Sequence, residues 1–391
     1  MNRLIQYIAV LCLALLGTGC AKSPESPDFA AMTQGLDSIF EPMFPADAPG
    51  AVVLVKKGDC IVYDRGFGLA RLDSLSAPMT DSTVLCIASV SKQFAAVAAL
   101  MLQERGRLSL GDTLTRFFPQ YTDSIFRRIS IAHLLSHTSG LPDSRPRTPE
   151  EWKAYTAWHR SPFATLDDYK RFALWEESCA FFERLDSVAF LPGEKYEYQN
   201  PTFQLLLPII EQSTGEKFEN WMAENIFVPA GMDRTAYFHP GCEPRNMAHG
   251  YIRNEAGEWE ENDYGEANFF PTKADGALYT TALDFLKWDE ALYGDRLMSA
   301  ASRREAHTGH IRTDLPYTDY GYGFFIEKRP GLPRKVFHTG DNGGFLLYEG
   351  RFEADSLFYL VFATHPHWPR EATAGRMDSV FLSTGLIRNA R

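Results

Sequence analysis

The chain has 391 residues, of which 45% are hydrophobic, and a formal net charge of −11 at pH 7. That apolar content is enough for a large buried core, arranged as one body or as two lobes. No basic run interrupts the acidic balance, which argues against nucleic acid as a partner and against electrostatic binding to anionic lipid.

The first residues have the pattern of a bacterial export signal. A basic start that includes Arg3 precedes an apolar run over residues 4–16, which is too short for a comfortable membrane span. The small residues at 17–19 then lead into Cys20. Because small residues directly before a cysteine resemble the lipoprotein processing site, we predict a signal peptide over residues 1–19 and a lipid on Cys20.

Residues 20–35 are polar and rich in proline, and we predict a flexible tether there. The lipid on Cys20 would attach the protein to a membrane of the bacterial cell envelope. An ordinary export signal cut nearby is the alternative, and it leads to the same compartment.

The mature body carries four cysteines, whose wide spacing does not indicate a disulfide scaffold: Cys60, Cys86, Cys179 and Cys242. The sequence has no Cys-x-x-Cys pair, and its histidine clusters are incomplete as ligand sets. We therefore predict neither a metal site nor a cofactor.

Both ends of the body are rich in strand-forming residues. Near the start, two such runs flank the turn Lys57-Gly58-Asp59 and predict a hairpin over residues 51–68. Near the other end, turn residues separate four more strand-like runs: 320–327, 335–338, 345–352 and 356–363.

The middle of the chain has helical periodicity instead. Amphipathic helices are expected at 131–135, 166–175, 202–214 and 218–227, and another helix at 377–382. This order predicts an α+β fold, in which strands from both ends form one antiparallel sheet flanked by helices and a mostly helical lobe is inserted. We expect one domain over residues 36–391, with a sheet lobe at about 36–110 and 275–391 and a helical lobe at about 111–274.

Ser89 and Lys92 lie three residues apart at the start of a predicted helix. Residues i and i+3 share a helical face, so the Lys92 amine can lie beside the Ser89 hydroxyl and accept its proton. Ser-x-x-Lys is also common by chance, and a capping serine followed by a surface lysine is the plain alternative. Ser91 has no lysine at the same spacing.

A second candidate element follows a Pro-Gly turn. Tyr198 and Asn200 would offer a phenol and a carboxamide to one site. A phenol can relay a proton if nearby ammonium groups lower its pKa. Taken in isolation, these residues favour the plain alternative, an ordinary Pro-Gly turn followed by a helix cap.

The sequence contains three His-Thr pairs, and we ask which of them contributes a further residue to the site. His338 closes a predicted strand at a predicted sheet edge, where Gly340 would let a substrate backbone approach. We therefore favour His338 for the site. We expect His307 to be a chance surface repeat and His137 to brace a loop.

Five elements in order resemble the serine β-lactamase and penicillin-binding-protein superfamily, in the branch of class C β-lactamases, D-alanyl-D-alanine carboxypeptidases, D-aminopeptidases and related esterases. Residues 87–94 resemble the nucleophile motif of this family, and residues 134–141 resemble its signature between the lobes. Residues 192–200, 276–284 and 338–340 follow in the expected order. The resemblance runs from about Gly50 to about Thr364.

The resemblance implies that Ser89 is acylated and that Lys92 and Tyr198 share general-base and general-acid duty. Asn200 would orient the substrate. The remaining residues implied for the site are His338, where many members have a lysine, Thr339 and Gly340 as further substrate-binding residues, and the backbone amides of Ser89 and Asp341 as an oxyanion hole.

Two residues depart from the family pattern. His338 is mostly neutral at pH 7, which makes it a weaker carboxylate anchor than lysine. If Asp341 faces the cleft, it should repel carboxylates and favour a cationic or neutral substrate. We expect an exported serine hydrolase that acts on peptides containing D-amino acids or on esters. The alternatives are a true class C-like β-lactamase and a non-catalytic penicillin-binding or sensor domain.

Overall fold

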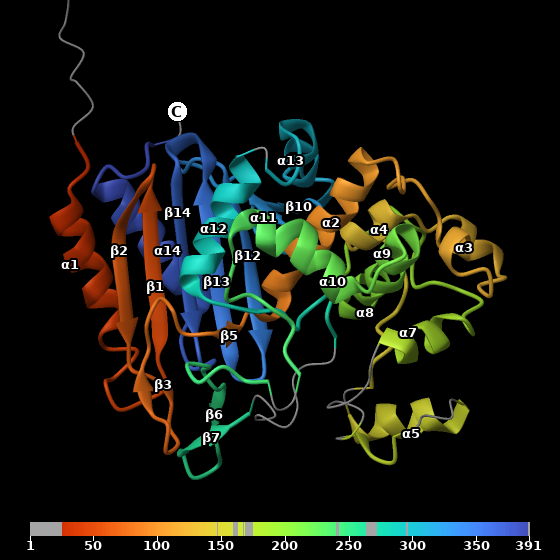
Figure 1. Ribbon diagram of the computed structural model, residues 1–391, viewed down its shortest axis with the longest axis horizontal. Helices are drawn as coiled ribbons and strands as arrows, with labels where there is room; N and C mark the ends of the chain where they lie inside the picture. The colour runs from red at the N-terminus through yellow and green to blue at the C-terminus, as the bar shows by residue number, and fades with distance from the viewer. Residues whose placement is uncertain are drawn as a thin grey trace, which may run out of the picture.

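A computed structural model describes residues 26–146, 148–158, 163–166, 168, 175–239, 242–262, 272–294 and 296–389. One large antiparallel sheet lies beside a mostly helical part, as Figure 1 shows. The predicted α+β architecture is confirmed. Cys20 and the predicted signal peptide lie outside the described residues.

The large sheet has eight strands in the order β2-β1-β14-β13-β12-β11-β10-β9, and neighbouring strands are antiparallel. The register of β1 with β14 runs from Ala51↔Ala363 to Lys57↔Leu357, so strands from the two ends of the chain lie side by side. The strands are β1 (Ala51–Lys57), β2 (Cys60–Phe67), β9 (Ile311–Arg312), β10 (Thr318–Tyr320), β11 (Phe325–Glu327), β12 (Lys335–Asn342), β13 (Phe345–Phe352) and β14 (Leu357–Ala363).

Helices cover both faces of this sheet. Successive side chains of a strand point to opposite faces. Val53 and Val55 therefore pack in the core with α1 and α14, whereas Val52 and Leu54 pack in a second core with α2 and α12. The four helices are α1 (Phe29–Phe40), α2 (Lys92–Glu104), α12 (Ala282–Tyr293) and α14 (Arg370–Ser383).

The prediction of a flexible tether over residues 20–35 is wrong for its last part, because α1 begins at Phe29. Met32 and Leu36 are spaced by four residues, lie on one helical face, and are fully buried against the sheet. The Asp28 carboxylate accepts a hydrogen bond from the Ala31 N–H at 2.9 Å and caps the helix. Burial of this apolar face outweighs the polar composition that favoured a tether.

The helical part contains most of the expected helices. The helix predicted at 202–214 is divided after Gln204, because Pro208 has no N–H to donate to the carbonyl four residues earlier. Most residues of the helix predicted at 166–175 lie outside the described ranges. The helices are α3 (Leu114–Phe117), α4 (Ile131–Leu135), α5 (Pro149–Trp158), α7 (Trp175–Phe182), α8 (Asn200–Gln204), α9 (Leu206–Thr214), α10 (Phe218–Met222) and α11 (Val228–Ala230), followed later by α13 (Ala300–Ala306).

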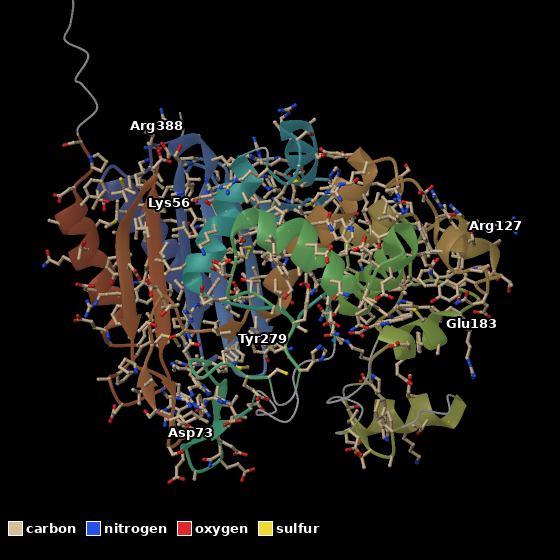
Figure 2. The ribbon with its side chains drawn as sticks, viewed as in Figure 1. Lys56, Asp73, Arg127, Glu183, Tyr279 and Arg388 are labelled. Atoms are coloured by element: carbon tan, nitrogen blue, oxygen red, sulfur yellow. The ribbon has the colours of Figure 1, made fainter. Side chains whose placement is uncertain are left out.

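Three small strand pairs complete the fold. β5 (Leu85–Cys86) pairs with β8 (Tyr279–Thr280), and Figure 2 shows Tyr279 between the sheet and the far end of the helical part, where Arg127 and Glu183 lie. This pair leads directly into the turn that carries Ser89. The other pairs are β3 (Leu69–Arg71) with β4 (Ala77–Pro78) and β6 (Tyr251–Arg253) with β7 (Trp259–Glu261).

Among the residues that the structure describes, no helix has the length and apolar character needed to cross a bilayer. No disulfide joins the four cysteines within these ranges: Cys60, Cys86, Cys179 and Cys242.

Candidate active site

Ser89 lies in a short 3-10 turn, Ala88–Ser91, that continues directly into α2. Ala88 has a positive φ of 45°, which is costly for a residue with a Cβ and is common near functional sites. Every residue from Lys92 to Leu102 is buried, so α2 runs through the core and its first turn lies where the sheet meets the helical part. The fold therefore holds the Ser89 turn against a rigid, buried helix.

Lys92 is fully buried, and its amine is directed at three oxygen atoms. The distances from Nζ are 3.1 Å to Ser89 Oγ, 2.7 Å to Asn200 Oδ1 and 2.8 Å to the backbone oxygen of Asp275. These contacts match the three N–H groups of an ammonium. Once it loses one proton, the amine has a lone pair that can accept the proton of Ser89.

The electrostatics of Lys92 favour this exchange near neutral pH. Burial lowers the pKa of Lys92 from its ordinary value to about 7, although the Asp275 carboxylate opposes the shift. A substantial fraction of the amine is therefore neutral at pH 7, which a general base requires. Sequence reasoning missed Asp275, because an isolated aspartate in a loop has no recognisable spacing to Lys92.

Tyr198 lies beside this pair, with the centre of its ring 5.0 Å from Lys92 Nζ. Burial raises the pKa of Tyr198 well above its ordinary value, and the smaller influence of the Ser89 hydroxyl acts in the opposite direction. The condition of a lowered phenol pKa, on which a base role depends, is therefore not met. The phenol stays protonated in the resting site and can donate a proton, whereas Lys92 is the group suited to accept one.

His137 braces the Tyr198 loop, as predicted. Its Nδ1 accepts a hydrogen bond from the Gln199 N–H at 3.1 Å, and its carbonyl accepts one from the Glu197 N–H at 2.9 Å. The His137 and Tyr198 rings lie 4.2 Å apart between centres. His137 also has a positive φ of 56°, a strained conformation that these contacts hold in place.

The ring of His338 is buried below the site and has no surface in the cavity, which corrects its predicted role in binding substrate. Its Nδ1–H donates to the Thr339 carbonyl at 2.7 Å, which leaves Nε2 to accept from the Tyr320 hydroxyl at 2.9 Å. Burial lowers the pKa of His338 to about 3, so the ring is neutral. Both nitrogens are occupied by the protein, and neither is left for a substrate carboxylate.

The backbone after His338 nevertheless has an open edge. β12 is an interior strand, but its register with β11 stops at Phe337, and from His338 to Asn342 it pairs with β13. Gly340 faces the Ser89 turn rather than a substrate, since a Cβ there would lie 2.7 Å from the Ile87 oxygen. The lack of a side chain at Gly340 lets the Ser89 turn pack directly against β12. His307, expected at the surface, is also buried, and its Nδ1 lies 3.0 Å from Glu353 Oε1.

A cavity of about 390 Å³ opens above Ser89. Its floor consists of Ser89, Tyr198 and Asn200, with Lys92 directly below, and Thr339 and Asp341 line the wall beside them. Ser89 and Asp341 therefore line one cavity, which an oxyanion hole built from their backbone amides would require. The remaining lining residues are Tyr196, Thr313, Asp314, Leu315, Phe325 and Arg370.

Sequence reasoning did not identify the charged residues Asp314 and Arg370 as part of this site. Asp314 comes from the turn between β9 and β10, and Arg370 from the first turn of α14. Neither segment has a motif, and only the folding of the chain brings them to Ser89. With Asp341, they form what we call the cavity rim.

The Beta-lactamase family model matches residues 36–380. The chain belongs to the beta-lactamase family. It is a serine hydrolase of this family, and Ser89 with the Lys92 amine at 3.1 Å is the candidate pair of nucleophile and base.

Two curated relatives and one solved structure illustrate the range of this family. Penicillin-binding protein 4* of Bacillus subtilis is 28% identical over 83% of the chain and 70% of its own length. D-alanyl-D-alanine-carboxypeptidase/endopeptidase AmpH of Escherichia coli is 25% identical over 93% of the chain and 92% of its own length. The crystal structure of a penicillin-binding protein from Bacillus halodurans is 26% identical, has a TM-score of 0.73, and covers 88% of this chain and 100% of that chain.

Proposed function

We propose that this protein is an exported serine hydrolase that forms an acyl-enzyme on Ser89 and acts on peptides containing D-amino acids or on related esters. The observation that carries the proposal is the 3.1 Å contact between the buried Lys92 amine and Ser89 Oγ. The similarity to a D-alanyl-D-alanine carboxypeptidase/endopeptidase supports the substrate class.

In the first half of the reaction, Ser89 Oγ attacks the substrate carbonyl while Lys92 takes the hydroxyl proton. The backbone N–H groups of Ser89 and Asp341 hold the resulting oxyanion, and one such donor typically contributes about 3 kcal/mol. The Asn200 carboxamide, which accepts from Lys92 through Oδ1, has its N–H₂ group to orient the substrate. The bond to the leaving amine or alcohol then breaks, and Lys92 returns its proton to this group, either directly or through the Tyr198 phenol, so that the amine is neutral again.

In the second half, water attacks the acyl ester and gives its proton to Lys92. The ester bond breaks, Ser89 regains its proton, and the acid product leaves. A site that completes only the first half would act as a penicillin-binding or sensor domain. Persistence of the acylated Ser89 for hours without product would favour that alternative.

The central experiment is labelling with a fluorophosphonate or penicillin-type probe. Wild type should be labelled, Ser89→Ala should not, and Ser91→Ala should retain labelling. Ser91 is the matched control, because its Oγ accepts from the Leu278 N–H at 3.2 Å inside the core and it has no lysine three residues later. Equal labelling of wild type and Ser89→Ala would contradict the proposal.

A true β-lactamase is the alternative that one observation favours. Arg370 lines the cavity, and a guanidinium there is a possible anchor for the carboxylate of a β-lactam. A chromogenic cephalosporin separates the two functions, because appreciable turnover would make β-lactams the leading substrate class. The neutral, buried His338 argues for slow turnover.

Export and lipidation are part of the proposal and rest on residues 1–20 of the sequence. Cys20→Ala should release the protein from the membrane fraction without changing the activity of the folded domain. If the wild-type protein is found in the soluble fraction, the lipid anchor is excluded.

A further inference from the structure

The charged side chains at the cavity rim differ in the number of partners that they bind. Arg370 Nη1 donates to the Gly340 carbonyl at 3.1 Å, and its Nε and Nη2 donate to Glu371 Oε1 at 2.9 and 2.6 Å. Its side chain is 16% exposed. The guanidinium is thus bound to the backbone of β12 and paired with a carboxylate, which reduces its capacity to bind a further anion.

The two acids of the rim are exposed, in contrast. Asp314 and Asp341 both line the cavity. Within the described residues, no salt bridge and no side-chain hydrogen bond joins either carboxylate to a partner. Once Arg370 is balanced by Glu371, the rim carries two uncompensated negative charges at the entrance to Ser89.

Among the described residues that line the cavity, Arg370 is the only lysine or arginine, and the Lys92 amine below the floor is held by its three oxygen partners. His338 is neutral and buried, and both of its nitrogens are occupied. Clefts lined by charge of one sign concentrate ligands of the opposite sign, and like charge brought close is unfavourable. The rim should therefore distinguish substrates by the charge that they bring into the cavity.

We propose that Asp314 and Asp341 make the Ser89 cavity selective for substrates with a protonated amine near the scissile bond, such as amides, peptides or esters of a D-amino acid with a free amino group. Substrates that bring a carboxylate to the same place are disfavoured. This inference rests on the proposed function, because it concerns the substrates of the same nucleophile.

The test uses three derivatives of D-alanine p-nitroanilide that differ at nitrogen: the free amine, which is cationic when protonated, the neutral N-acetyl form and the anionic N-succinyl form. Binding is measured by equilibrium titration of Ser89→Ala, in which no turnover can occur. The dissociation constant of the cationic form should be about fivefold lower than that of the neutral form, and that of the anionic form higher still, as expected for partly exposed charges.

The same titrations in Asp314→Asn and Asp341→Asn backgrounds should each reduce the preference by a factor of about two, and the double variant should abolish it. Raising the salt concentration should reduce the preference of the parent protein and leave the double variant unchanged. Asp59→Asn, which removes an exposed acid from the turn between β1 and β2, is the matched control and should not alter the preference.

Tightest binding of the anionic form, weakened by Arg370→Gln, would overturn the inference and assign carboxylate recognition to Arg370. Equal binding of the three forms, or a preference that survives the double variant, would overturn it as well. These outcomes are independent of the proposed function, which is tested separately by hydrolysis in wild type against Ser89→Ala. Turnover without charge preference would contradict the inference alone.

Discussion

The floor and the rim of the cavity differ in how tightly the protein holds their polar groups. On the floor, the buried Lys92 amine has three oxygen partners, from Ser89, Asn200 and Asp275. On the rim, Asp314 and Asp341 are exposed on strand ends and turns. The buried, preorganised groups of the floor can determine the chemistry at Ser89. The solvent-exposed charges of the rim can influence which substrates bind there.

The largest effect is expected from removing the base of the floor. Lys92→Gln keeps the approximate length of the side chain but cannot take a proton at neutral pH, and kcat/KM should fall about a thousandfold. Lys56→Gln is the matched control, because Lys56 is also buried but pairs with Glu290 at 2.6 Å, and Figure 2 shows it at the end of the sheet. Retention of more than about a tenth of the activity in Lys92→Gln would mean that another group is the base.

The pH dependence should follow Lys92 as well. Because its pKa is about 7 and the neutral amine is the base, kcat/KM should rise by about tenfold per pH unit below 7 and level off above it. The ascending limb should be absent in Lys92→Gln. An ascending limb that persists in Lys92→Gln would indicate that another group is the base.

Burial of Lys92 should also appear in the stability of the protein. Its folded pKa of about 7 lies below the ordinary value of 10.5, so between these pH values the unfolded chain binds more protons than the folded protein. The contribution of Lys92 to the free energy of unfolding therefore rises with pH across this window. Chemical denaturation should show that the free energy of unfolding of Lys92→Met exceeds that of wild type by the largest amount at and below pH 7. This difference should decrease as the pH rises.

Gly340→Ala tests how the floor is joined to the sheet. The added methyl group would meet the Ile87 oxygen at 2.7 Å and Leu347 Cδ1 at 2.9 Å, so the Ser89 turn must shift. We expect a loss of about 2 kcal/mol in the free energy of unfolding together with reduced kcat. Gly111→Ala is the control, since its nearest neighbour, Ser109 Oγ, is 3.5 Å away. Unchanged kcat in Gly340→Ala would show that the turn tolerates displacement.

The smallest effect is expected from Tyr320→Phe. This change removes the donor at 2.9 Å from His338 Nε2 and leaves a buried acceptor unpaired, which should cost about 1 to 2 kcal/mol in the free energy of unfolding. Because His338 does not line the cavity, kcat/KM should fall by less than about tenfold and equally for cationic, neutral and anionic substrates. A change in kcat/KM that depended on substrate charge would mean that His338 takes part in charge recognition at the cavity rim.

Local patterns were sufficient for much of the fold. The runs now seen as β1, β2, β13 and β14 have strand-forming composition and clear turns, and their pairing follows from the need to bury both faces of one sheet. The tether was misjudged over residues 29–35, which form the first part of α1, because a short apolar stripe becomes informative only when a sheet is available to cover it. Composition alone could not show that partner.

The sequence by itself determined that Ser89 lies beside Lys92 and that Tyr198 lies close to Asn200, because residues close in the chain keep their relation in a helix or turn. The contact of Ser89 with Lys92 is a consequence of i,i+3 spacing. Only the tertiary structure decided the burial that lowers the pKa of Lys92, the inward position of His338, and the meeting of Asp314, Asp341 and Arg370 at one rim. Desolvation and long-range charge arrangement depend on which distant segments pack together, and no local spacing contains that information.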